Sequence, residues 1–162
     1  MKKLFYLFLL LPVLAGCDRT DAPDTDITDT DIIDTNVTNI SFTDTGCNKG
    51  QTKSETDPSL LILKFEGRNL RVTRTNALMN CSINGGGIVC EVSSEGTTIN
   101  YNVYEKDGPT VNCNCMVNEM TSLVKGLTPG VIYTMKYCYY EPFTFVFERG
   151  LHLIIDVDSL KY

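Results

Sequence analysis

The stretch that decides the fold reads Ser59-Leu-Leu-Ile-Leu-Lys-Phe65, Glu66-Gly67-Arg68-Asn69 and Leu70-Arg-Val-Thr-Arg-Thr75. Its first and third segments carry apolar and β-branched residues with a two-residue period, which predicts β-strands. The middle segment holds glycine and asparagine, the residues that tight turns require. The stretch therefore predicts two strands joined by a turn.

Similar segments continue along the chain, separated by turn signals such as Gly85-Gly86-Gly87 and Thr128-Pro129-Gly130, and no window shows a convincing helical stripe. Eight or nine short strands rich in Val, Ile, Thr, Phe and Tyr are typical of an antiparallel sandwich or a small barrel. We predict an all-β, antiparallel β-sandwich (Ig-like) of about eight strands over residues 37–162. The further predicted strands are 37–42, 87–92, 97–105, 120–127, 131–140, 142–148 and 151–157.

Alternation within the strands predicts which side chains fill the core. The set expected to face inward is Leu61, Leu63, Phe65, Leu70, Val72, Ile99, Tyr101, Val103, Phe143, Phe145, Phe147, Leu151, Leu153, Ile155 and Val157. The same rule places Tyr140 opposite Tyr137 and Tyr139. These three tyrosines are candidate interface aromatics, because tyrosine joins an apolar ring to a polar tip, although a ring half buried at a sheet edge is the simpler interpretation.

The first residues predict an exported protein. Lys2 and Lys3 precede an apolar run over 4–14, and Leu14-Ala15-Gly16-Cys17 follows. An apolar run of this length makes a helix of about 16 Å, which is too short for a permanent membrane span. The tetrapeptide resembles the lipobox of bacterial lipoproteins, which implies cleavage of a signal peptide at residues 1–16 and lipid on Cys17. We expect anchorage to the bacterial envelope, with the outer membrane as the preferred site; ordinary secretion with Cys17 unmodified is the alternative.

Residues 17–36 read as an acidic tether rich in Asp and Thr. Residues 18–45 hold eight acids and one base, a net charge of −7, whereas residues 46–162 have a net charge of −1. The low isoelectric point therefore belongs to the tether. A nearly neutral domain predicts no binding of nucleic acid.

Six cysteines follow Cys17, and an even number in an exported domain predicts disulfides. Six cysteines allow fifteen pairings. Cys113 and Cys115 are neighbours on one face of an extended chain, so each is expected to pair elsewhere. Two alternatives use this pair: a thiolate metal site, which lacks a second close pair, and Cys-x-Cys redox catalysis, which lacks a helix start. The disulfide candidates are Cys47, Cys81, Cys90, Cys113, Cys115 and Cys138.

No motif predicts an enzyme. The single histidine, His152, lies at an outward position of a predicted strand, and no nucleophile elbow, phosphate-binding loop or paired-histidine motif accompanies it. Asp156 and Asp158 share a face and fit an acid and base only in principle, because nothing in the sequence makes one carboxyl group a weaker acid than the other and a solvated strand end is the simpler interpretation. We therefore expect no catalysis, no metal and no cofactor beyond the lipid on Cys17.

Several segments together resemble the small cysteine-containing lipoproteins of unknown function of the Bacteroidetes, over about 70–157. The resemblance implies a β-sandwich lipoprotein at the cell surface or facing the periplasm, with no established activity. Ser82 and Val111 stand where many relatives have cysteine. Against this family, Cys90 and Cys138 are departures, which suggests an extra Cys90–Cys138 bond, with Cys47 and Cys81 bonded to the Cys113/Cys115 pair. The segments are Asn76-Ala-Leu-Met-Asn-Cys81, Tyr104-Glu-Lys-Asp-Gly108, Asn112-Cys-Asn-Cys115, Gly126-Leu-Thr-Pro-Gly130 with Tyr133, and Gly46-Cys-Asn-Lys49.

The expected function is that of a lipid-anchored binding or accessory module. Its expected partners are the bilayer, through the acyl chains, and an unidentified envelope protein or glycan. The alternative is a thiol-redox or metal-handling lipoprotein that uses Cys113 and Cys115. A structural component of the envelope is a third possibility.

Overall fold

The computed structural model describes residues 36–48, 57–81, 87–106 and 112–160. All of them belong to one compact unit. The signal peptide, Cys17 and nearly all of the tether lie outside the described residues, so the predictions about them remain predictions. Among the described residues, no helix has the length and apolar character needed to span a bilayer.

The described residues form ten strands and one short 3₁₀ turn, η1. The strands include a two-residue strand that the sequence pattern did not predict, and two strands of twelve residues that extend well beyond their predicted bounds. In chain order the elements are β1 (Thr38–Asp44), β2 (Cys47–Asn48), β3 (Leu60–Glu66), β4 (Asn69–Asn80), β5 (Ile88–Glu95), β6 (Thr98–Glu105), β7 (Asn114–Lys125), β8 (Ile132–Tyr137), β9 (Phe143–Val146), β10 (His152–Asp156) and η1 (Val157–Ser159).

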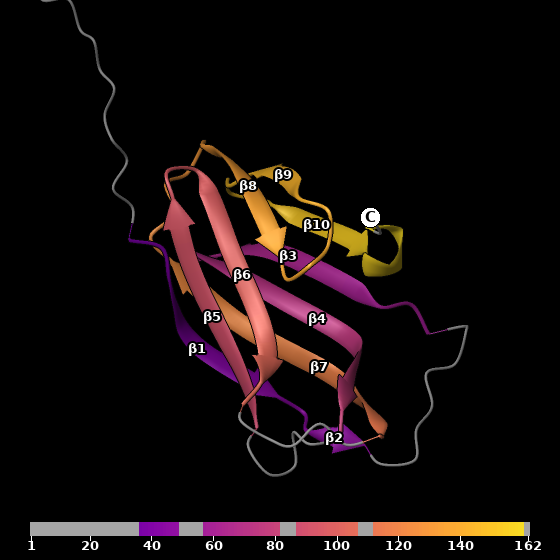
Figure 1. Cartoon of the computed structure of the whole chain (residues 1–162). Helices are drawn as coiled ribbons and strands as arrows, with labels where there is room; N and C mark the ends of the chain where they lie inside the picture. The colour runs from indigo at the N-terminus through magenta and orange to yellow at the C-terminus, as the bar shows by residue number, and fades with distance from the viewer. Residues whose placement is uncertain (1–35, 49–56, 82–86, 107–111, 161–162) are drawn as a thin grey trace, which may run out of the picture. The chain divides into compact units, whose positions relative to one another are not determined.

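Two sheets pack face to face, which confirms the sandwich and removes the barrel alternative. One sheet has the order β1-β7-β4-β3-β10, with β2 paired to β7, and the other has the order β5-β6-β8-β9. Figure 1 shows β5 and β6 lying over β4 and β7. One pairing is not antiparallel: β6 and β8 run parallel. After β6 the chain crosses to the other sheet, forms β7 there and then returns as β8. A crossover of this kind allows β8 to run in the same direction as β6.

The predicted strand pair over 59–75 is confirmed as a hairpin of β3 and β4. Their register ends at Glu66 opposite Asn69, so only two residues form the turn. Gly67 has φ of 65°, a conformation that glycine adopts without steric cost. Arg71 donates to the Glu66 carboxylate on the exposed outer face.

The main core lies between the two sheets and consists of the inward side chains that alternation predicted, together with others. Leu61, Leu63, Leu70 and Ile99 have no exposed surface. Inside it, the Tyr101 hydroxyl is paired with the Ser122 hydroxyl at 2.6 Å, so its polar tip is satisfied. The fully or nearly fully buried members are Val37, Leu61, Leu63, Leu70, Val72, Ile99, Tyr101, Val124, Leu127, Tyr133, Met135, Tyr137, Phe145, Phe147 and Val157.

A second, smaller group of buried side chains, called here the corner cluster, comprises Ala77, Cys115, Val117 and Met120. It begins where β4 and β7 change phase. In β4 the buried positions before Asn76 are the even-numbered 70, 72 and 74, whereas the buried position after it is the odd-numbered 77. Asn76 itself has φ of 51°. The backbone rotation at Asn76 therefore marks the boundary between the two groups on β4.

Candidate functional site

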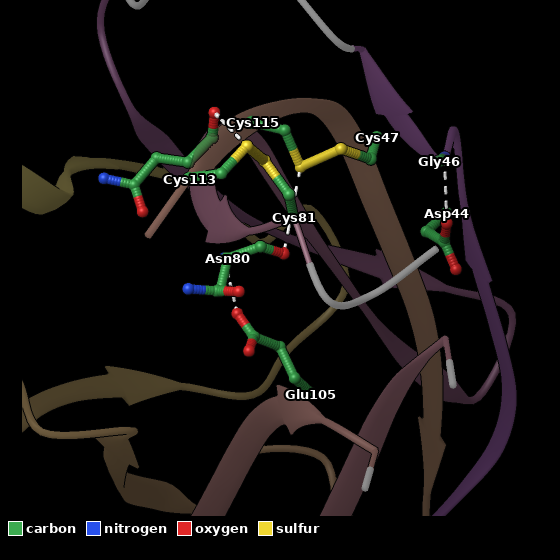
Figure 2. The surroundings of a disulfide bond; sticks show 9 residues. Asp44, Gly46, Cys47, Asn80, Cys81, Glu105, Cys113 and Cys115 are labelled. Carbon is green, nitrogen blue, oxygen red and sulfur yellow. Dashed lines mark hydrogen bonds between the residues drawn. A yellow bond between two sulfur atoms is a disulfide. The ribbon is translucent and has the colours of Figure 1, made fainter. Parts of the chain in front are cut away.

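The four cysteines of the corner form two disulfides. Cys47 of β2 is bonded to Cys115 of β7, and Cys81, just after β4, is bonded to Cys113, just before β7. Figure 2 shows the two bonds close together. This pairing confirms that Cys113 and Cys115 bond to different partners, and that these partners are Cys47 and Cys81.

Hydrogen bonds support the same corner. The Cys81 amide donates to the Cys113 carbonyl at 3.0 Å, and the Asn80 amide donates to the Glu105 carboxylate, which joins the end of β4 to the other sheet. The Gly46 amide donates to the Asp44 carboxylate in the turn before β2. Covalent and polar links therefore hold a region whose buried apolar group is small.

The predicted Cys90–Cys138 bond is wrong, because both residues are free thiols in this structure. Strand β6 lies between them. Cys90 of β5 is opposite Val103 of β6, while the Cys138 amide donates to the Tyr101 carbonyl from the other side. Two strand spacings amount to about 9 to 10 Å, beyond the separation of about 7 Å between Cα atoms that a disulfide tolerates.

The predicted placement of the tyrosines also needs correction. β8 ends at Tyr137, and the next residue, Cys138, has φ of 50°, so strand alternation stops there. The rings of Tyr137 and Tyr140 are stacked with centroids 5.9 Å apart, although alternation put them on opposite faces. Tyr139 stacks on Tyr140 at 4.6 Å, and its side chain is 69% exposed.

These tyrosines line a cavity of about 310 Å³. Its walls come from both halves of the long strand β4, from the segment after β8 and from η1. The phase change at Asn76 contributes to its shape, because the side chains on either side of that residue point differently. The lining includes Ser59, Arg74, Asn76, Tyr137, Tyr139, Tyr140, Cys138 and Asp158.

Arg74 is the unusual residue of this lining. It is 7% exposed, and its Nη1 atom is buried without a hydrogen-bond partner. Within the part of the chain that the structure describes, no carboxylate forms an ion pair with Arg74. A buried charge without a partner costs several kcal/mol, and such groups concentrate at functional sites.

The charge of Arg74 acts on the groups around it. Burial raises the pKa of Tyr137 and of the Cys138 thiol, while the nearby Arg74 charge lowers each of them in part. Burial and the hydrogen bond with Tyr139 raise the pKa of Tyr140 to about 12, with Arg74 again opposing the shift. These groups are therefore neutral at pH 7 and contribute no negative charge beside Arg74.

The sequence pattern contains a signal for Arg74 that the predictions above do not include. Leu70, Val72 and Arg74 share one face of their strand, so a face predicted to be buried carries an arginine. A charged residue in phase with core residues is rare unless it is paired. This arginine on a buried strand face identifies the charged residue of the cavity, but it does not identify the tyrosines that line the cavity with it.

The other candidate residues lie elsewhere or have structural partners. His152 is exposed on edge strand β10, as predicted. The Asp156 carboxylate accepts the Asp158 amide at the start of η1, which gives it a capping role. Comparison of the chain with protein families, curated proteins and solved structures finds no match.

Proposed function

We propose that this chain is a lipid-anchored β-sandwich module of the bacterial cell envelope, located at the outer membrane, that binds a ligand in the tyrosine-lined cavity and catalyses no reaction. The single observation that supports it best is Arg74, whose buried guanidinium nitrogen has no partner in a cavity with aromatic walls. Concave sites with a few polar groups among aromatic side chains are typical of ligand binding. The lipobox-like tetrapeptide ending at Cys17 supports the anchor.

The anchor is tested by feeding producing cells an alkyne-bearing fatty acid and detecting its attachment to the protein. Wild type should be labelled and Cys17→Ala should not, whereas Cys90→Ala, which removes a free thiol of the folded domain, should be labelled like wild type. Equal labelling of wild type and Cys17→Ala contradicts lipidation at this residue.

Ligand binding is tested with a photocrosslinking phenylalanine analogue in place of Tyr139, which is 69% exposed and lines the cavity. The control is the same analogue at Ile132, which is 62% exposed and does not line it. In whole cells, a discrete adduct at position 139 that is absent at position 132 supports the proposal. Hydrolytic or redox turnover by purified residues 18–162 argues against it.

A second candidate function is thiol or metal handling, and one observation favours it. The sulfur atoms of Cys47, Cys81 and Cys115 lie within 4.8 Å of one another. If the two disulfides were reduced, these residues and Cys113 would offer four thiolates, the ligand set of structural zinc sites. Counting thiols in protein made in the periplasm separates the two functions. Two free thiols fit the binding module, whereas six, of which four become unreactive on adding zinc, fit the alternative.

A further inference from the structure

The position of Arg74 favours a ligand of negative charge. It lies on the inner face of β4, opposite Leu61 of β3 and Met120 of β7. Its side chain cannot reach bulk water freely, since the residue is 7% exposed. The part of the cation that lines the cavity is therefore the part that a bound anion can approach.

The tyrosines determine the shape of ligand that fits. Tyr137, Tyr140 and Tyr139 form a continuous stack that runs from the main core to the exposed mouth of the cavity. The hydroxyl groups of Tyr139 and Tyr140 are 3.4 Å apart. Because Tyr140 is stacked between the other two rings, the stack offers a ligand the exposed ring of Tyr139 and the hydroxyl groups at its edge.

The charges of the lining limit the number of negative charges on the ligand. Asp158 also lines the cavity, and its charge acts on Tyr140. One arginine and one aspartate suit a ligand with a single negative charge better than a phosphate dianion. A carboxylate is planar and matches the two parallel N–H donors of a guanidinium.

We infer that the cavity binds a ring-bearing monocarboxylate, with its carboxylate on Arg74 and its ring against Tyr139, beside the hydroxyl groups of Tyr139 and Tyr140. This inference rests on the proposed binding function and specifies the ligand class. An acidic sugar such as a hexuronate has this combination of a carboxylate, a ring and hydroxyl groups, and it serves as the probe.

The experiment uses the full chain in detergent micelles and measures glucuronate binding by saturation-transfer-difference NMR. The matched probe is the methyl ester of glucuronate, which keeps the ring and loses the charge. Glucuronate should bind at least about tenfold more tightly than the ester, a difference of about 1.4 kcal/mol. Acetate, which has the charge without the ring, should also bind more weakly than glucuronate.

Variants assign the effect to the cavity. Arg74→Met should lower glucuronate affinity by at least about tenfold, and Arg71→Met is the control, because Arg71 is on the same strand but faces outward. Tyr139→Ala removes an exposed ring without disturbing the main core and should weaken glucuronate binding more than acetate binding. Circular dichroism melts establish that each variant is folded.

Three results overturn the inference: equal binding of glucuronate and its ester, undiminished binding by folded Arg74→Met, or no binding of any probe. These results concern only the ligand class. Whether the cavity binds any ligand at all is tested separately by the crosslinking comparison of positions 139 and 132. Failure of the ligand class and failure of the binding function therefore give different results.

Discussion

The main core and the corner cluster share strands β4 and β7 but are stabilised in different ways. Of the residues that the structure describes, fifteen buried side chains make up the main core and none of them is in a disulfide, and the partly buried Cys90 and Cys138 that pack against it are free thiols. The corner cluster has four buried side chains and two disulfides. Small groups of buried residues contribute little hydrophobic free energy, so cross-links that restrict the unfolded chain have most value there.

The comparison also locates the candidate site. The cavity lies where the two regions meet, and residues of both line it: Tyr137 from the main core, and Ala77 and Met120 from the corner cluster. Arg74 is the last inward residue before the phase change at Asn76. Two cores that do not merge leave a gap between them, and here the gap holds a cation and three tyrosines.

The largest expected effect comes from a cavity in the main core. Leu63→Ala should lower the free energy of unfolding by about 3 to 5 kcal/mol, because Leu63 has no exposed surface among tightly packed neighbours. Met120→Ala, in the corner cluster, should cost about 2 kcal/mol, at the low end of the range for such changes. Urea unfolding measures both. Equal losses would contradict the proposed difference between the regions.

Removing either disulfide should cost nearly as much. Replacing both cysteines of Cys47–Cys115 or of Cys81–Cys113 by serine should cost about 3 to 4 kcal/mol, slightly more for the first, whose sequence separation is 68 rather than 32 residues. Hydrogen exchange of the double variants should show faster exchange in β2 and in the adjoining ends of β4 and β7, with β3 and β8 still protected. Cys90→Ser, which breaks no bond, is the control. Uniform loss of protection would mean that the corner is not a separate region.

A glycine at the margin of the main core should have an intermediate effect. A Cβ atom on Gly126 would lie 2.6 Å from the Asn36 carbonyl oxygen, beside the buried Val37, and Gly126 has φ of 93°. Gly126→Ala should therefore destabilise the domain by about 2 to 3 kcal/mol. The matched control is Gly130→Ala, where φ is also positive but no atom lies within 4 Å, so a cost of about 1 kcal/mol is expected. Thermal unfolding followed by circular dichroism compares them.

The free thiols should have the smallest effect, and only at alkaline pH. Burial raises the pKa of both Cys90 and Cys138 above 9.0. The unfolded chain therefore releases these protons at a lower pH than the folded chain, so stability is retained below pH 9 and declines as pH rises above it. Cys90→Ser with Cys138→Ser should make this decline shallower while leaving stability at pH 7 within about 1 kcal/mol of wild type. Identical pH profiles for variant and wild type would contradict the raised pKa values.

The sequence predicted the strands of the main core more completely than those of the corner cluster. In the main core, strand alternation is regular, so the hairpin of β3 and β4 and the inward face of β6 were predicted correctly. The predicted strands stopped at Thr75 and began again at Met120, although β4 continues to Asn80 and β7 starts at Asn114. The missing halves belong to the corner cluster. Their buried positions are out of phase with the rest of each strand, and in β4 the change coincides with the positive φ of Asn76.

The sequence by itself determined the all-β fold class and the inward faces of the regular strands. It also determined that Cys113 and Cys115 do not pair with each other. These properties depend on the two-residue period and on neighbouring positions. Only the tertiary structure decided which cysteines are paired, because that depends on whether a third strand separates them. It also placed Arg74 in the same cavity as Tyr137, Tyr139 and Tyr140. The arginine is more than sixty positions before these tyrosines in the sequence, so their proximity depends on how the two sheets pack.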